Sequence, residues 1–167
     1  MTRVVARTPP ETSLMARLAA RPGVYSDAFC VDLPEAVGLP AFIAAFYGTR
    51  LFSAERAILR LAGMPGTRAD LAALAAGDAA TFAAWTVEER REDEILLADF
   101  ADATKSWLHV APHDRGTILW FGSAILPPDA AARIGPAARL SIGPHRFYSR
   151  RLLSAAARDL RRPTRRP

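Results

Sequence analysis

The stretch that decides the fold is TFAAWTVEERREDEILLADFADATKSWLHVAPHDRGTILWFGSAIL, residues 81–126. Apolar and polar side chains alternate along it with a period of two, which is typical of β-strands that bury one face. The alternation breaks at Glu92-Asp93, at residues 101–103 and at Pro112–Arg115. We therefore predict four strands joined by hairpins, which is an antiparallel meander.

The segments before this meander predict one more strand and three short helices. Residues 24–33 alternate with the same period and are expected to form the extra strand. Capping residues and glycines bracket three apolar segments, and these are the start and stop signals of helices. The helices are expected at residues 39–47, between Ser53 and Gly63, and between Thr67 and Gly77.

After the meander, Gly143-Pro144 predicts the start of a long helix from about His145 to Arg162. The predicted fold class is α+β: an antiparallel sheet of about five strands, packed on this C-terminal helix, with short helices after the first strand. Residues 24–162 are expected to form this one domain. Residues 1–23 are expected to be a flexible arm, and residues 163–167 a basic tail.

Strand parity assigns each residue of the meander to one of two faces. We assume that Arg91 pairs with Glu94, Phe100 with Thr104 and Ala111 with Gly116. One face is then a predicted core: Trp85, Val87, Leu96, Ala98, Phe100, Ser106, Leu108, Val110, Leu119, Phe121, Ser123 and Ile125.

The predicted core face has the pattern of a ligand cavity, in which a few polar groups stand on an apolar wall. We expect a small hydrophobic molecule to bind there without a covalent bond. The expected walls are Trp85, Phe100, Leu108 and Phe121, with Tyr148 nearby, and the expected orienting groups are Ser106, Ser123 and Asp27. The alternative is a filled core in which both serine hydroxyls bond to the backbone.

The opposite face carries an aromatic patch, because the assumed register places Trp107 opposite Trp120, flanked by Leu97. Such a patch on an open sheet needs a cover. The cover is the N-terminal arm, a second copy of the chain in a homodimer, or nothing if the register is wrong.

Charge is unevenly distributed along the 167 residues, whose net charge is +5. Nine arginines follow residue 138, against the single acid Asp159. We interpret them as a solvated helix face, with nucleic acid and an anionic membrane surface as the weaker alternatives. The chain contains no apolar run long enough to span a membrane and no signal peptide pattern, so a cytoplasmic location is expected.

The sequence contains no catalytic motif, and no cofactor or metal is expected. The three histidines, at 109, 113 and 145, lack metal-ligand spacing, and Cys30 is isolated between apolar neighbours. Neither candidate serine stands in a Gly-x-Ser-x-Gly turn. The enzyme alternative is a cyclase-like or isomerase-like pocket with Asp27 as general acid/base. Otherwise Asp27 bonds to the backbone or pairs with an arginine.

Four segments carry a family resemblance: YSDAFCVDLP (25–34), LPAFIAAFYGTR (39–50), FAAWTVEERREDEILLADF (82–100) and GPHRFYSRRLL (143–153). In order and spacing they resemble the bacterial family named domain of unknown function 2867. The order of elements also resembles the helix-grip architecture of START-like ligand-binding domains. The resemblance implies a fold and a class of cavity, and no particular reaction.

Overall fold

The computed structural model describes residues 3–53, 63–64, 66–114, 116–128 and 136–161. Its elements in chain order are β1 (Val5–Ala6), α1 (Leu14–Ala19), β2 (Tyr25–Leu33), α2 (Leu39–Tyr47), α4 (Arg68–Ala76), β3 (Thr81–Phe82), β4 (Trp85–Arg90), β5 (Glu94–Asp99), β6 (Thr104–His113), β7 (Gly116–Ile125) and α5 (Pro136–Leu160). The predicted α+β class is confirmed. The helix expected between Ser53 and Gly63 falls on residues 54–62, which lie outside the described residues.

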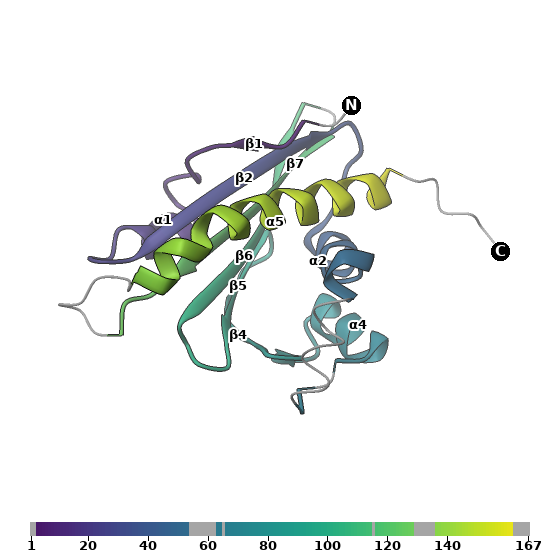
Figure 1. The fold of residues 1–167 in the computed structure, drawn as a ribbon. Helices are drawn as coiled ribbons and strands as arrows, with labels where there is room; N and C mark the ends of the chain where they lie inside the picture. Colours follow the sequence, from purple (N-terminus) through teal and green to yellow (C-terminus); the bar gives the residue numbers. More distant parts are fainter. Residues whose placement is uncertain (1–2, 54–62, 65, 115, 129–135, 162–167) are drawn as a thin grey trace.

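The strands form one antiparallel sheet in the order β1-β2-β7-β6-β5-β4-β3. The predicted meander from β4 to β7 is confirmed, but the sheet has seven strands instead of about five. The two added strands are the two-residue β1 and β3 at its edges. Helix α5 crosses one face of the sheet, and α2 and α4 lie beside it (Figure 1). We call this the inner face.

The inner core is filled by aromatic rings, three of which come from α2. The rings of Phe46 and Phe121 lie 4.6 Å apart between centroids, and Tyr47 meets Phe46 edge-on at 5.2 Å. From α5, Leu152 and Ala156 are buried against the same cluster. Edge-on and offset ring contacts of this kind stabilise a core beyond the area that they bury.

Two of the predicted helices have the predicted boundaries, because their signals are local. Helix α2 begins with a proline in its first turn and ends before Gly48. In front of α4, Thr67 and Asp70 form a capping box, and Gly77 closes the helix in the left-handed conformation with φ 92°. The signal is a proline and a glycine at the ends of α2, and side chains that bond to free backbone N–H groups at the start of α4.

The register of β5 differs from the assumed one by a single residue. Ala98 pairs with Lys105, and a bulge between Val87 and Glu89 keeps Trp85 and Val87 on their predicted face. β5 and the end of β4 after the bulge are therefore reversed: Ile95 and Leu97 belong to the inner core, whereas Leu96 faces outward. The reason is the turn at residues 100–103, where Asp99 Oδ1 accepts hydrogen bonds from the backbone N–H groups of residues 103 and 104.

The β6–β7 hairpin differs from the assumed register by two residues, because its turn is tighter than predicted. His113 pairs with Gly116, so Trp107 lies opposite Gly122 instead of Trp120. A shift of two leaves every side chain on its predicted face. The two tryptophans are still diagonal neighbours on the outer face, with ring centroids 6.3 Å apart.

Helix α5 begins nine residues earlier than predicted, and Pro144 lies inside it. A residue before proline is normally pushed out of the helical conformation by a clash of its Cβ with the proline ring. Gly143 has no Cβ, which removes part of that clash. The Gly-Pro pair that predicted a helix start is therefore compatible with a continuous helix.

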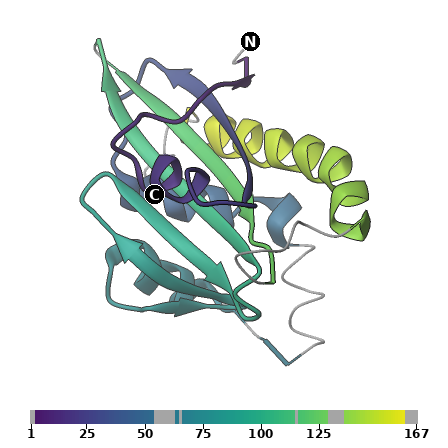
Figure 2. The ribbon, with the colours of Figure 1, turned by 90° about the vertical axis from the view of Figure 1, so that its left-hand side faces the viewer.

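Residues 3–23 of the N-terminal arm pack on the sheet, so the expectation of a flexible arm is wrong for these residues. β1 pairs with β2, and the side chain of Ser13 caps α1. Leu14 and Met15 are fully buried in a second core on the outer face. Figure 2 shows α1 and α5 on opposite sides of the sheet. Gly122 permits this contact, because a Cβ there would lie 3.0 Å from Met15 and 2.9 Å from Trp107.

Candidate functional site

The three predicted orienting residues lie side by side in one row of the inner face. Ser106 pairs with Ser123 across β6 and β7, and Ser123 pairs with Asp27 across β7 and β2. All three are buried. Antiparallel partners point to the same face, so the row forms a polar belt through an apolar core.

Asp27 stands at the centre of a chain of hydrogen bonds. Its Oδ1 accepts from Ser123 Oγ at 2.8 Å, and its Oδ2 accepts from the hydroxyl of Tyr25 at 3.1 Å. Ser123 Oγ lies 2.8 Å from Nε2 of His145, which comes from α5. Because Ser123 donates to Asp27, its oxygen accepts from His145, which requires a proton on Nε2.

Ser106 is satisfied separately, by the hydroxyl of Tyr47 from α2 at 2.8 Å. Both candidate serines therefore bond to side chains, whereas the filled-core alternative expected bonds to the backbone. Tyr47 is itself 1% exposed. This end of the belt is closed by the aromatic cluster of α2.

The Asp27 end of the belt reaches an open pocket of about 480 Å³ at the edge of β2. Asp27 and Arg146 provide its polar wall from β2 and α5, and Arg7 belongs to the arm. Most of the remaining lining is small or apolar: Ala6, Thr8, Pro9, Ala19, Ser26 and Ala28. Its volume falls within the range of small-molecule sites, about 300–1,000 Å³.

Tyr25 links Arg146 to this network, since the guanidinium donates to its hydroxyl at 3.4 Å. Burial raises the pKa of Tyr25, Arg146 opposes that change, and the negative charge of Asp27 adds to it. The hydrogen bond to Tyr25 raises the pKa of Arg146 in turn. The hydroxyl of Tyr25 thus connects two residues of the pocket wall, the Asp27 carboxylate and the Arg146 guanidinium.

The predicted wall residues are dispersed. Leu108 and Phe121 are buried in the filled inner core, and Tyr148 is half-buried against it. Trp85 is half-buried on the same face, and its indole N–H is buried without a hydrogen-bond partner among the described residues. Phe100 was wrongly assigned to the wall: it lies in the β5–β6 turn and is 72% exposed.

The predicted interface residues are all buried within the chain. Leu97 faces the inner core because of the β5 register, and Trp107 and Trp120 are covered by α1. Of the three covers considered for the aromatic patch, the structure shows the N-terminal arm, and the assignment of Leu97 to the patch is wrong.

Sequence reasoning missed His145 and Tyr25 as members of the site. His145 was expected at a helix start, in a capping or packing role, because Gly143-Pro144 was interpreted as the start of the helix. Its spacing from the fully buried Ser149, four residues later, places both on one helix face. Tyr25 shares strand parity with Asp27, so the alternation of β2 carried the signal for it.

The arrangement differs from that of a hydrolytic triad. In a triad the carboxylate orients the histidine, whereas Asp27 here bonds to Ser123. Within the part of the chain that the structure describes, no three His, Cys, Asp or Glu side chains gather closely enough to hold a metal ion. What the geometry provides is a buried acceptor, a guanidinium donor and a path for a proton between Asp27 and His145.

Comparisons with protein-family models, with curated proteins and with solved structures found no match to this chain. The resemblance described above therefore stays a prediction. None of the described helices is long and apolar enough to cross a membrane.

Proposed function

We propose that the chain binds a small, largely apolar molecule non-covalently in the pocket beside Asp27. The observation that carries this proposal is the position of the carboxylate: it is buried, fixed by two hydroxyls, and forms part of the wall of an open pocket. Apolar walls with a few fixed polar groups favour a ligand with an apolar body and one polar end.

The polar end of such a ligand has two partners of opposite charge. A donor group would bond to Asp27, and an acceptor would bond to Arg146 across the pocket. The packing around Phe121 favours this edge site over the centre of the inner core, because α2 fills the space in front of that ring.

A first experiment is native mass spectrometry of the purified chain, compared with its denatured mass. An adduct of a few hundred daltons that is lost on denaturation would support the proposal and identify the ligand class. A second experiment uses N-phenyl-1-naphthylamine, a fluorescent probe with an apolar body and a single N–H donor.

The matched variants are Asp27→Asn and Asp32→Asn. Both remove one carboxylate from β2, but Asp32 is exposed and lies on the other face. We expect Asp27→Asn to weaken probe binding by about tenfold, the value of one charge-assisted hydrogen bond, and Asp32→Asn to leave it unchanged. Equal affinity in both variants, or no fluorescence change with the intact chain, would overturn the proposal.

The hydrogen bonds from Asp27 through Ser123 to His145 favour general acid/base catalysis in the same pocket as a second candidate. This candidate predicts turnover of the compound that mass spectrometry identifies. Asp27→Asn would then abolish turnover and leave the affinity for that compound nearly intact. Unchanged turnover in this variant would rule the candidate out.

A further inference from the structure

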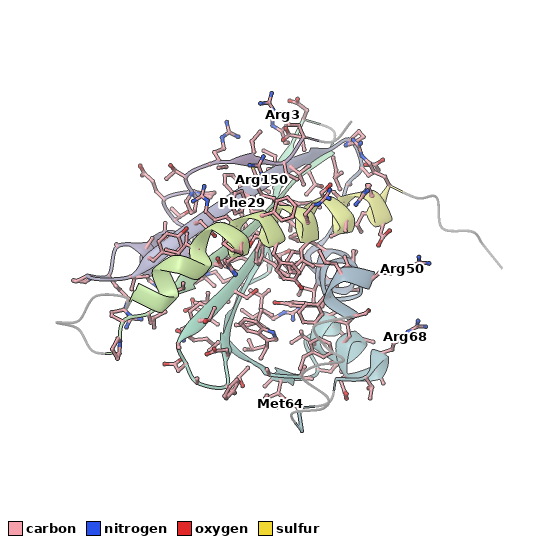
Figure 3. All side chains as sticks on the ribbon, in the orientation of Figure 1. Arg3, Phe29, Arg50, Met64, Arg68 and Arg150 are labelled. Carbon is pink, nitrogen blue, oxygen red and sulfur yellow. The ribbon has the colours of Figure 1, made fainter. Side chains whose placement is uncertain are left out.

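A second groove, of about 610 Å³, runs between the outward side of α5 and the residues that precede β1. Four of the residues that line it are arginines: Arg3 from the arm, and Arg146, Arg150 and Arg151 from α5. Figure 3 shows Arg150 between α5 and the N-terminal segment that carries Arg3. Four guanidinium groups on one concave surface give it a strong positive potential.

Neutral groups contact three of these arginines, Arg146, Arg150 and Arg151. Arg146 and Arg150 lie over the ring of Phe29, at 5.4 and 5.9 Å from its centroid. Arg150 also donates to the carbonyl of Val4 at 3.2 Å. No carboxylate among the described residues forms an ion pair with any of the four. Among the four, Arg146 alone has a carboxylate near it within the described part of the chain, that of Asp27, and no ion pair there compensates the charge of the other three.

An exposed aromatic ring accompanies this charge. Phe147 lines the same groove and is 64% exposed, although most rings of this chain are buried. The guanidinium of Arg151 lies 5.3 Å from its centroid. A flat ring beside arginine can stack a second flat ring, as aromatic side chains stack nucleobases.

We infer that this groove binds a phosphate ester that carries an aromatic ring, the chemistry of a nucleotide. The guanidinium fork matches the geometry of phosphate oxygens, and Phe147 supplies a face for the ring. The concave shape and the volume favour one small molecule over a long polymer. This site is separate from the proposed pocket, apart from Arg146, which lines both.

The test is calorimetric titration of the full chain with adenosine 5′-monophosphate at low and high salt. Ribose 5-phosphate and adenosine serve as the two halves of this probe. We expect the monophosphate to bind more tightly than either half, and we expect its affinity to fall as salt rises, because the attraction is between charges.

The decisive comparison is between Arg151→Gln and Arg158→Gln. Each removes one exposed charge from α5, but Arg158 lies outside the groove and its hydrogen bond is to the carbonyl of Ser154. We expect Arg151→Gln to lower the affinity for the monophosphate about tenfold, the value of one charge-assisted contact. Arg158→Gln should leave it within about twofold of the intact chain, since an exposed charge outside the groove contributes little.

Phe147→Ala separates the contribution of the ring from that of the charge. It should weaken the binding of the monophosphate and leave the binding of ribose 5-phosphate unchanged. Three results would overturn the inference. These are an absence of heat with the monophosphate, equal losses in Arg151→Gln and Arg158→Gln, or much tighter binding of a single-stranded oligonucleotide that both variants weaken alike. The last result would assign the arginines to a nucleic-acid surface.

Discussion

Glu94 connects three parts of the molecule through one buried carboxylate, which is 3% exposed. Its Oε2 accepts from the backbone N–H of Leu14 at 2.9 Å and from the indole N–H of Trp107 at 2.7 Å. Its Oε1 accepts from Arg91 at 2.9 Å. The carboxylate thus fixes α1 to the outer face of the sheet.

Replacing Glu94 with glutamine should therefore destabilise the fold. The amide keeps the shape but offers one acceptor oxygen where two are used, so at least one donor loses its partner. We expect a loss of roughly 1.5–3 kcal/mol in the free energy of unfolding, measured by urea titration. Glu92→Gln, at an exposed position in the neighbouring turn, is the control. Similar losses in both variants would contradict this account of Glu94.

At the scale of elements, the accuracy of prediction from sequence depended on how local each signal was. Helices α2 and α4 were predicted correctly because their caps act within a few residues. The register of β5 was not predictable, because it depends on the side chain of Asp99 and on a bulge in β4. The pattern of a strand predicts which of its residues share a face, whereas the hairpin turns determine the register between neighbouring strands.

The residues of the candidate site also differ in whether a local pattern predicted them. Strand parity predicted that Ser106, Ser123 and Asp27 share a face, and the structure confirms it. His145 was missed because its contact joins α5 to β7, and no pattern within one element specifies it. The assignment of Phe100 failed with the register of β5. Parity within a strand predicted which residues share a face of the sheet. Contacts between different elements could not be predicted from the sequence.

The capping box of α4 makes a prediction about pH. The backbone N–H and hydroxyl of Thr67 both bond to Asp70, and they lower the pKa of that carboxyl. Its stabilising effect is fully present above the unfolded pKa of about 3.9, and it is lost as pH falls through the lower folded value.

We therefore expect Asp70→Asn to be less stable than the intact chain at neutral pH, and the difference to shrink as the pH falls below about 4. Thermal unfolding at a series of pH values measures this. Asp78→Asn, just beyond the same helix, is the control. A difference between Asp70→Asn and the intact chain that stays constant from neutral to acid pH would disprove the role of the capping box.

At the scale of the whole molecule, the sheet lies between two separate cores, and the outer one depends on the arm. Leu14, Met15 and Leu18 are the residues of α1 that cover Trp107 and Trp120. Without this cover the predicted aromatic patch would be exposed. The arm thus occupies the surface that a second copy of the chain would cover in the homodimer alternative.

Loosening the arm should make the chain associate with itself. Leu14→Ala removes a fully buried side chain from the outer core, and Leu39→Ala removes one that is 2% exposed from the inner core. Each should cost about 2–5 kcal/mol. Sedimentation over a range of concentrations should show dimers in the Leu14 variant and monomers in the Leu39 variant. The same mass for both variants at every concentration would refute this.

The pocket beside Asp27 lies where two consecutive prolines end the pairing of the arm with β2. β1 follows β2 only as far as the N–H of Arg7, which bonds to the carbonyl of Ala28. Thr8 is followed by Pro9 and Pro10, and neither proline has an N–H with which the pairing could continue. The arm therefore leaves the sheet while β2 continues beside it, so the space that we assign to a ligand is the gap left where the ladder stops.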